Sequence, residues 1–279
     1  MAKDLLLRER VDGVMTLTMN NPDRLNGWTM SMLDALGTAL RDADRDDATK
    51  VIVLTGTGRY YCAGVNLGGS LKVDHPASLY RFILERNMEL FNQFLRLKTP
   101  ILIAANGPAI GASVTSATLC DGIVASEKAT FSTPFAALRV PPEGCSSEVF
   151  PKLFGAETAD RLLGTEGWKP TGAEAVEIGL AQWVVPHDEL MSKAQSIAQQ
   201  WIEDGHTRTY PAGFTQAQLE AINARESKVL AKAFLSPPFL MAQYEFLWGK
   251  GKRQNALLFL ALAKSHRAWK RLLPADARA

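Results

Sequence analysis

The sequence predicts an α/β fold of repeated strand–turn–helix units, followed by a helical C-terminal part. Val14–Met19 shows the period-two alternation of a half-buried strand, and Val51–Leu54 is a wholly apolar run followed by Gly56. Such an apolar run is typical of a strand buried on both faces. Between these strands, apolar residues recur at helical spacing: Met30, Leu33, Leu36, Leu40 and Ala43.

The remaining elements follow the same pattern. Thr29 precedes the first helix and is a suitable N-cap residue. Helical spacing returns later in the chain at Leu84, Met88, Phe91 and Leu95. Ile101–Ala105 is a second buried strand, and the turn 106–108 after it is expected to lead into a helix. Short strands are predicted at 123–125 and 130–131.

After about residue 195 the pattern becomes helical only. Gln216–Phe234 is charged and amphipathic, and Pro237 and Pro238 separate it from a last helical block, Phe239–Leu273. We therefore predict a core over residues 1–195 and a helical region over residues 196–279. A helical appendage without a large core of its own often serves oligomerisation.

Composition narrows the classes of protein. The chain has 279 residues, of which 47% are hydrophobic, which excludes intrinsic disorder. A formal net charge of +2 gives no overall case for nucleic acid or a membrane surface as partner. Three widely spaced cysteines and four isolated histidines predict neither a disulfide scaffold nor a metal site.

Localisation signals are weak. The first ten residues contain only three consecutive leucines, too few for a signal peptide, and the last residues carry no peroxisomal tripeptide, so a cytoplasmic protein is expected. Thr99–Cys120 has no charged residue and is long enough to cross a bilayer. Its prolines, glycines and hydroxyl residues fit better with a buried strand, a turn and a buried helix.

Two glycine-containing turns are candidate binding elements. Tyr61–Leu67 and Asn106–Ala112 each follow an apolar strand. Glycine lets the backbone approach a ligand closely, and free amide N–H groups attract negative charge. If the two turns converge, they would form an oxyanion hole. The alternative is that these glycines only end strands.

Glu143 is the candidate general base. It lies in an otherwise uncharged stretch, Val140–Ser147, between a Pro-Pro pair and a glycine. Apolar surroundings raise the pKa of a carboxyl group toward the range useful for proton transfer. The alternative is an exposed glutamate in a turn. A nucleophile, Ser113 or Cys145 with a histidine as base, also stays open, although no spacing supports it.

Taken together, these segments resemble the crotonase (enoyl-CoA hydratase/isomerase) superfamily in order and spacing. The resemblance rests on Asn21–Asn26, on Val51–Gly64 and on Asn106–Gly111, and it extends from about residue 5 to 195. Within that superfamily, Thr133–Leu138 followed by Pro142–Lys152 is similar to the peroxisomal type of Δ3,Δ2-enoyl-CoA isomerase.

This resemblance implies a spiral of ββα repeats with a C-terminal helical trimerisation region, and an acyl-CoA thioester as substrate. Two backbone amides, placed by the resemblance at Val65 and Ala112, would hold the thioester oxygen. The other residues that it places at the substrate or CoA are Arg24, Leu25, Ala63, Gly64, Asn66, Leu67 and Gly111. A homotrimer or a dimer of trimers is expected.

The resemblance also separates the possible reactions. The two glutamates of the family's hydratases correspond here to Thr115 and Phe135, neither of which can accept a proton. The single glutamate of the isomerases corresponds to Glu143. It would move a proton from C2 to C4 of a 3-enoyl-CoA in fatty-acid β-oxidation, without a cofactor. Asn66 stands where the peroxisomal isomerases have an acid.

Three alternatives stay open from the sequence: a hydratase or another crotonase-type enzyme, a catalytically silent acyl-CoA-binding protein and a hydrolase. The C-terminal part adds one observation. From Phe246 to Ala275 there are seven basic residues and no acidic one: Lys250, Lys252, Arg253, Lys264, Arg267, Lys270 and Arg271. They form either a solvated helix face or a surface for the CoA phosphates.

Overall fold

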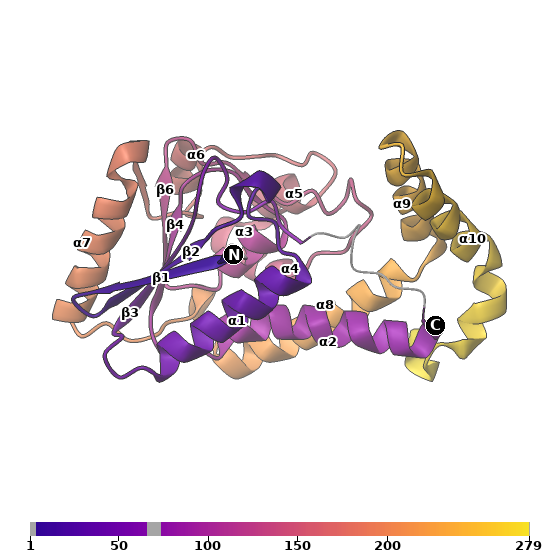
Figure 1. The fold of residues 1–279 in the computed structure, drawn as a ribbon, viewed down its shortest axis with the longest axis horizontal. Coiled ribbons are helices and arrows are strands. Elements are labelled where there is room, and N and C mark those ends of the chain that lie inside the picture. Colours follow the sequence, from indigo (N-terminus) through magenta and orange to yellow (C-terminus); the bar gives the residue numbers. More distant parts are fainter. Residues whose placement is uncertain (1–3, 66–73, 279) are drawn as a thin grey trace.

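The computed structural model describes residues 4–65 and 74–278. It contains a six-stranded sheet, which lies toward the left in Figure 1, away from α9 and α10. The strand order is β1-β2-β3-β4-β6-β8, in which β1 is antiparallel to β2 and the other neighbours are parallel. The strands are β1 (Leu6–Val11), β2 (Val14–Met19), β3 (Val51–Gly56), β4 (Ile101–Ala105), β6 (Gly122–Ser126) and β8 (Trp183–Val185). A second, parallel pair joins β5 (Ala109–Ile110) to β7 (Phe131–Ser132).

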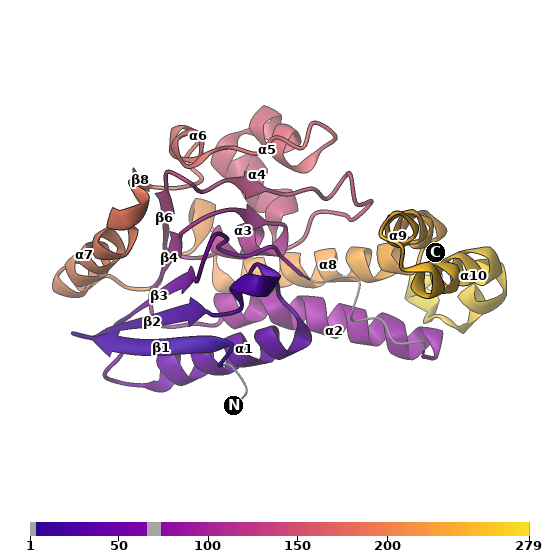
Figure 2. The ribbon, with the colours of Figure 1, turned by 45° about the horizontal axis from the view of Figure 1, so that its top comes forward.

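Helices cover both faces of the large sheet (Figure 2). In chain order they are α1 (Met30–Arg45), α2 (Pro76–Leu95), α3 (Ala112–Ala117), α4 (Ser146–Phe154), α5 (Ala156–Leu163), α6 (Gly172–Glu177), α7 (Leu190–Glu203), α8 (Gln216–Phe234), α9 (Pro237–Gly249) and α10 (Arg253–Trp269). Short 3-10 turns lie at Pro22–Arg24 (η1), His187–Glu189 (η2), Pro211–Gly213 (η3), Lys270–Leu272 (η4) and Ala275–Ala277 (η5).

Alternate residues of the strands face different helices, because successive side chains point to opposite sides of a sheet. Val51 and Val53 of β3 pack with α7, whereas Ile52 and Leu54 pack in the main core with α1 and α2. All four side chains are buried. The prediction that Val51–Leu54 is buried on both faces is therefore confirmed.

The two longest helices, α2 and α8, lie side by side and extend from the sheet toward α9 and α10 (Figures 1 and 2). The far end of this pair has an apolar core of its own, which includes Tyr80, Ile83 and Phe239. Another small core joins α9 to α10 through Leu247 and Phe259. Helices α9 and α10 therefore lie at the far end of the α2–α8 pair, away from the sheet.

Most sequence predictions are confirmed, including the α/β class, the strands and the Thr29 cap, whose side chain accepts a hydrogen bond from the Met32 amide. The helical block predicted over Phe239–Leu273 is helical and consists of α9, α10 and η4, with a break between α9 and α10 around Gly251, whose φ is +72°. The turn at 106–108 leads first into β5 and only then into α3. The division at residue 195 stays a prediction, and this residue lies within α7.

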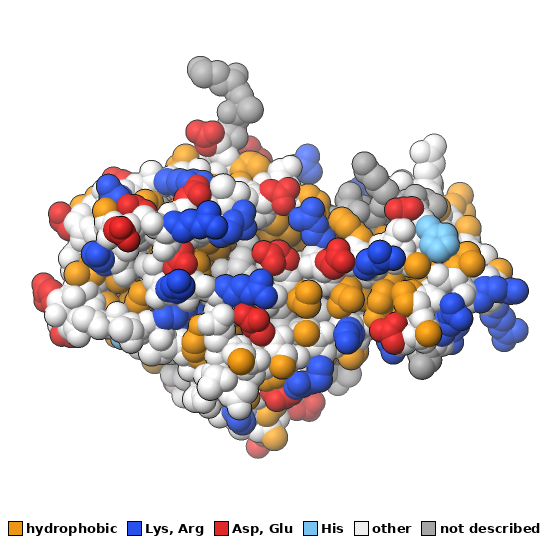
Figure 3. Space-filling model, turned by 90° about the horizontal axis from the view of Figure 1, so that it is seen from below, with side chains coloured by type: hydrophobic (Ala, Val, Ile, Leu, Met, Phe, Trp, Pro, Cys, Tyr) orange, Lys and Arg blue, Asp and Glu red, His pale blue; other side chains and the backbone are white. Residues whose placement is uncertain are grey.

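Figure 3 shows one face of the molecule from below. Acidic and basic side chains are mixed over the part that contains the sheet, and hydrophobic side chains gather toward the end with α9 and α10. The exposed large hydrophobic residues of this end include Phe246, Trp248 and Leu257, with exposed fractions of 54%, 41% and 52%. All seven basic residues of the C-terminal part are exposed.

Two further properties concern only the part of the chain that the structure describes. Its helices are too short or too polar to span a membrane. Its His, Cys, Asp and Glu side chains form no group of three that could hold a metal ion. Thr99–Cys120, the uncharged stretch, folds as β4, β5 and α3.

Candidate functional site

The two glycine-containing turns lie directly against each other. The Cys62 amide donates to the Pro108 carbonyl at 3.2 Å, and the Ile110 amide donates to the Cys62 carbonyl at 3.0 Å. Gly64 has φ +77°, and a Cβ added there would lie 2.4 Å from the Ile110 carbonyl oxygen. Only glycine allows this close approach, so Gly64 has a structural reason beyond ending a strand.

Two backbone amides near this contact are available to a ligand. Val65 follows Gly64, and Ala112 follows Gly111, whose φ is +62°. Both residues line the same cavity. Among the described residues, no atom accepts a hydrogen bond from the amide of either one. A backbone N–H group without a protein partner can donate a hydrogen bond to a ligand oxygen. The predicted convergence of the turns is thus present.

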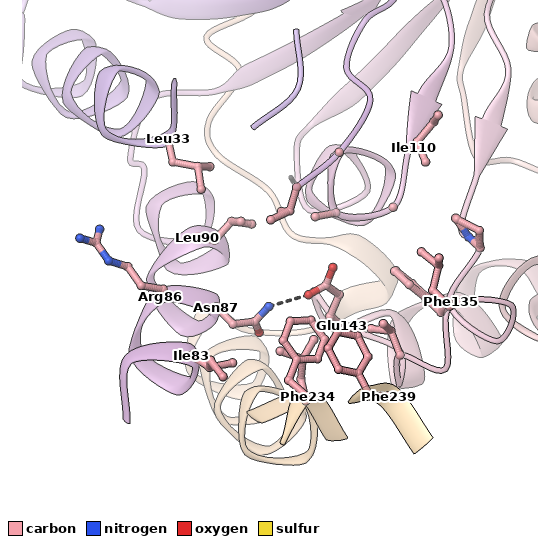
Figure 4. Close-up of a pocket in the computed structure, with 18 of the residues that line it drawn as sticks. Leu33, Ile83, Arg86, Asn87, Leu90, Ile110, Phe135, Glu143, Phe234 and Phe239 are labelled. Carbon is pink, nitrogen blue, oxygen red and sulfur yellow. Dashed lines mark hydrogen bonds between the residues drawn. The ribbon is translucent and has the colours of Figure 1, made fainter. Parts of the chain in front are cut away.

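The cavity has an empty volume of about 1040 Å³, part of it open to solvent, and its lining is mainly apolar. Figure 4 shows side chains from α1, α2 and α8 meeting the glycine turns and the segment around Glu143. The lining residues other than Val65, Ala112 and Glu143 are Met30, Leu33, Ala63, Gly64, Phe82, Ile83, Arg86, Asn87, Leu90, Ile110, Gly111, Pro134, Phe135, Leu138, Val140, Leu230, Phe234 and Phe239.

Glu143 is the only carboxylate among the described residues that line this cavity, and its exposed fraction is 7%. Asn87 of α2 donates its Nδ2 to Glu143 Oε2 at 2.5 Å (Figure 4). Burial raises the pKa of Glu143 to about 7; the Asn87 hydrogen bond lowers it and the charge of Glu226 raises it. Glu143 is therefore not an exposed turn glutamate, and it can exchange a proton near neutral pH.

A second buried carboxylate, Glu226 of α8, fixes the turn that follows Glu143. It accepts hydrogen bonds from the Cys145 amide at 2.6 Å, from the Ser147 amide at 2.9 Å and from the Ser147 hydroxyl. Burial raises the pKa of Glu226 to about 7 against these hydrogen bonds, which lower it. Glu226 does not line the cavity, and it holds the turn through the two amides and the Ser147 hydroxyl.

Asn87 is itself held in place. Its Oδ1 accepts a hydrogen bond from the Ser227 hydroxyl at 2.8 Å, and the neighbouring Asn223 of α8 donates to Asn92 Oδ1 at 2.9 Å. These polar side chains lie between α2 and α8 and are all buried. In this arrangement the Asn87 oxygen faces Ser227 and its Nδ2 group faces Glu143.

The sequence did not identify Asn87 or Glu226, although both had a signal. Asn87 falls at helical spacing between Leu84 and Phe91, and Glu226 falls between Ile222 and Leu230. A polar residue on an apolar helix face is expected to have a buried partner.

The remaining predicted residues have different positions. Arg24 is exposed, and Leu25 is linked to the first glycine turn because its carbonyl accepts the Ala63 amide at 3.0 Å. Neither side chain lines the cavity. Asn66 and Leu67 lie outside the described residues.

Thr115 and Phe135 occupy the two positions at which the family's hydratases have glutamates. The Thr115 hydroxyl donates to the Ala112 carbonyl at 3.3 Å within α3, and Phe135 lines the cavity. Neither side chain can act as a base. Within the described lining, the cavity therefore offers one proton acceptor of suitable pKa.

The alternative nucleophiles do not fit. The Ser113 hydroxyl bonds to the Cys62 and Ile110 carbonyls. Burial raises the pKa of the Cys145 thiol, and its Sγ donates to the Leu219 carbonyl. In the described parts of the chain, neither residue has a histidine as hydrogen-bond partner. Both are structural groups here.

Known proteins resemble this chain in sequence and in fold. The chain is 33% identical over 257 residues to a human protein named enoyl-CoA delta isomerase 2, covering 86% of the chain and 62% of that protein. It is 35% identical over 191 residues to mouse enoyl-CoA delta isomerase 3, peroxisomal, covering 66% of the chain and 58% of that protein. It thus spans less than two thirds of either relative.

Among solved structures, an enoyl-CoA hydratase/isomerase from Pseudoalteromonas atlantica superposes with a TM-score of 0.74 at 26% identity, covering 88% of this chain and 98% of that one. The sequence pattern of the enoyl-CoA hydratase/isomerase family matches residues 9–234, which is most of the chain. The chain therefore belongs to the enoyl-CoA hydratase/isomerase family, within the crotonase superfamily.

Proposed function

We propose that the protein is a Δ3,Δ2-enoyl-CoA isomerase that converts a 3-enoyl-CoA into a 2-trans-enoyl-CoA, as a step of fatty-acid β-oxidation. One observation carries the proposal. A single buried carboxylate, Glu143, with a pKa of about 7, shares an apolar cavity with the amides of Val65 and Ala112, which have no hydrogen-bond acceptor among the described residues.

The reaction needs one base and one anion-binding site. Glu143 takes a proton from C2, and the negative charge spreads over the dienolate to the thioester oxygen. The amides of Val65 and Ala112 donate hydrogen bonds to that oxygen, each worth about 2.7–4 kcal/mol of barrier in comparable sites. The protonated Glu143 then returns the proton at C4. The electrons stay within the substrate, so the proposal includes no cofactor.

The burial of Glu143 favours transfer of the same proton from C2 to C4. A proton on a carboxyl group that is 7% exposed exchanges with water less readily than one on the surface. The hydrogen bond from Asn87 to Oε2 leaves Oε1 for the substrate. Since Asn87 donates from its Nδ2, it favours the charged form that must accept the first proton.

Hydration would require a carboxylate to activate water, and the hydratase positions hold Thr115 and Phe135. Phe135 also contributes a ring to the cavity wall. The names of the human and mouse relatives support isomerisation over hydration. The observations therefore favour the isomerase over the hydratase and over a silent binding protein.

The experiment that tests this proposal is incubation with a 3-enoyl-CoA and, separately, with a 2-enoyl-CoA. We expect the 3-enoyl-CoA to give the 2-trans isomer and neither substrate to give a 3-hydroxyacyl-CoA. Formation of the hydroxyacyl product would favour a hydratase. Binding without any conversion would identify a silent acyl-CoA-binding protein.

The raised pKa of Glu143 predicts a pH dependence. The base must be ionised, so kcat/KM for a 3-enoyl-CoA should rise with pH through about 7 and level off above it. A glutamate of ordinary pKa, about 4.3, would already be ionised near pH 6 and give a flat profile there. Steady-state kinetics between pH 5.5 and 8.5, roughly one and a half units on either side of 7, decide between these profiles.

We extend the proposal to assembly and to the CoA moiety. The exposed Phe246, Trp248 and Leu257 of α9 and α10 would be covered in a homotrimer or a dimer of trimers. The exposed basic residues of the same region, together with Arg24, would meet the CoA phosphates. Sedimentation analysis of the purified protein tests the assembly: a monomer at working concentration would contradict it.

A further inference from the structure

We infer that Phe234 limits the length of acyl chain that the protein accepts, because its ring separates the cavity of Glu143 from a second apolar cavity. The inference rests on the proposed function, since it takes the substrate to be an acyl-CoA. It goes further in naming the residue at which the acyl chain must stop.

The second cavity lies among the start of α2, α9, α10 and η4, and it has an empty volume of about 770 Å³, part of it open to solvent. Apart from Asp74, its described lining is apolar: Pro76, Leu79, Phe234, Leu235, Leu240, Leu258, Phe259, Leu262, Trp269 and Leu272. Such a surface suits hydrocarbon and offers almost nothing to a polar ligand.

Phe234 is the one residue among the described lining that both cavities share. It ends α8, and its ring stacks on Phe239 of α9 with 4.4 Å between ring centroids and 7° between planes. Phe239 is 1% exposed, so it supports Phe234 from a well-packed position. The two cavities are therefore separated by the ring of Phe234, which is held in place by stacking on Phe239.

The direction of the acyl chain follows from the proposed anchoring of the thioester. Figure 4 shows Ile110, beside the glycine turns, on one side of the Glu143 carboxylate and the Phe234 and Phe239 rings on the other. A thioester held at Val65 and Ala112 therefore directs the carbons beyond C4 toward this pair, in a cavity that Ile83 and Leu230 also line.

The separation of the two cavities by Phe234 can be measured through the dependence of acyl-CoA affinity on chain length. Each methylene group that enters an apolar cavity improves binding about fourfold, and a group that meets a wall does not. Affinity should rise with chain length until the chain reaches Phe234 and then stop rising. Replacing the ring by a methyl group joins the two cavities, so the rise should continue.

The test is the dissociation constant of saturated acyl-CoAs from butanoyl- to octadecanoyl-CoA, measured by titration calorimetry on the wild type and Phe234→Ala. Saturated chains bind without being turned over, so the readout does not depend on isomerase activity. The break in affinity is the chain length at which affinity stops rising. In Phe234→Ala we expect this break at chains longer by about two carbons or more, with about 15-fold tighter binding at that length than in the wild type. Butanoyl-CoA should bind both proteins equally, which shows that the site is intact.

Two further variants sharpen the result. Phe246→Ala, in α9 but in neither cavity and 54% exposed, should leave the break where it is in the wild type. Leu258→Trp partly fills the second cavity and, at 37% exposure, has room for the larger ring; added to Phe234→Ala, it should move the break back. An unmoved break in Phe234→Ala overturns the role of Phe234 alone. Binding of no acyl-CoA by the wild type overturns the proposed function as well.

Discussion

Glu143→Gln should lower kcat for 3-enoyl-CoA isomerisation by about 10²- to 10⁴-fold, the usual contribution of a positioned base. Glutamine has the same shape, and its side-chain oxygen can still accept the Asn87 hydrogen bond. It cannot accept the C2 proton. Steady-state assays on the purified variant measure the loss, and saturated acyl-CoA binding should be retained because the cavity is unchanged.

The melting temperature of Glu143→Gln shows whether a loss of activity comes from the missing base or from unfolding of the variant. Burial raises the pKa of Glu143 from an unfolded value of about 4.3 to about 7, so the ionised form destabilises the folded chain above pH 7, by on the order of 3 kcal/mol. This cost disappears as pH falls below the unfolded value. Glu143→Gln should therefore melt at a higher temperature than the wild type at pH 8, and the difference should shrink toward pH 4.

The matched control for this substitution is Glu148→Gln. Glu148 lies five residues further on, in α4, and its exposed side chain pairs with Arg225. It does not line the cavity, so activity should stay at the wild-type level. Undiminished turnover in Glu143→Gln, with the control behaving as expected, would refute the role of Glu143.

Gly64→Ala should cost about 10²- to 10³-fold in kcat, as the removal of one oxyanion donor does in comparable enzymes. Its Cβ would lie 2.4 Å from the Ile110 carbonyl oxygen, which is backbone and cannot rotate away. The two turns must move apart, and the Val65 amide moves with them. Turnover of a 3-enoyl-CoA, together with the dissociation constant of a saturated acyl-CoA, measures the effect.

Gly179→Ala is the matched control, because Gly179 has φ +80° and no atom within 4 Å of an added Cβ. It introduces the same unfavourable backbone conformation, about 1–2 kcal/mol, without the clash. This variant should be less stable and fully active. A folded Gly64→Ala protein with wild-type kcat would show that the glycine contact does not position the anion site.

The main strands and helices could be predicted because their buried residues recur at the spacing of a strand or a helix along the chain. The helix Gln216–Phe234 was predicted with the bounds that the structure shows. β1 (Leu6–Val11) was missed because five of its six residues are exposed and only pairing with β2 makes it a strand. β5 was missed because two residues carry no period, and its strand character comes from β7.

The parts of the candidate site that are marked by local sequence could be predicted. The contacts that join residues from distant elements could not. Glu143 and the glycine turns have signals in the sequence, since proline, glycine and a lone acid mark them. The Asn87 contact joins α2 to a loop 56 residues away, and Glu226 joins α8 to the same loop. Such pairings depend on how the helices pack, which spacing along the chain does not reveal.

The most direct test of the account follows the proton itself. A 3-enoyl-CoA carrying deuterium at C2 is incubated with the protein in ordinary water, and the 2-trans-enoyl-CoA formed is analysed by mass spectrometry and NMR. If Glu143 is the single base that serves both carbons, part of the deuterium should appear at C4. With both C2 hydrogens replaced by deuterium, one deuterium stays at C2; complete isomerisation with no deuterium at C4, or a 3-hydroxyacyl-CoA as product, would contradict a buried single-glutamate shuttle.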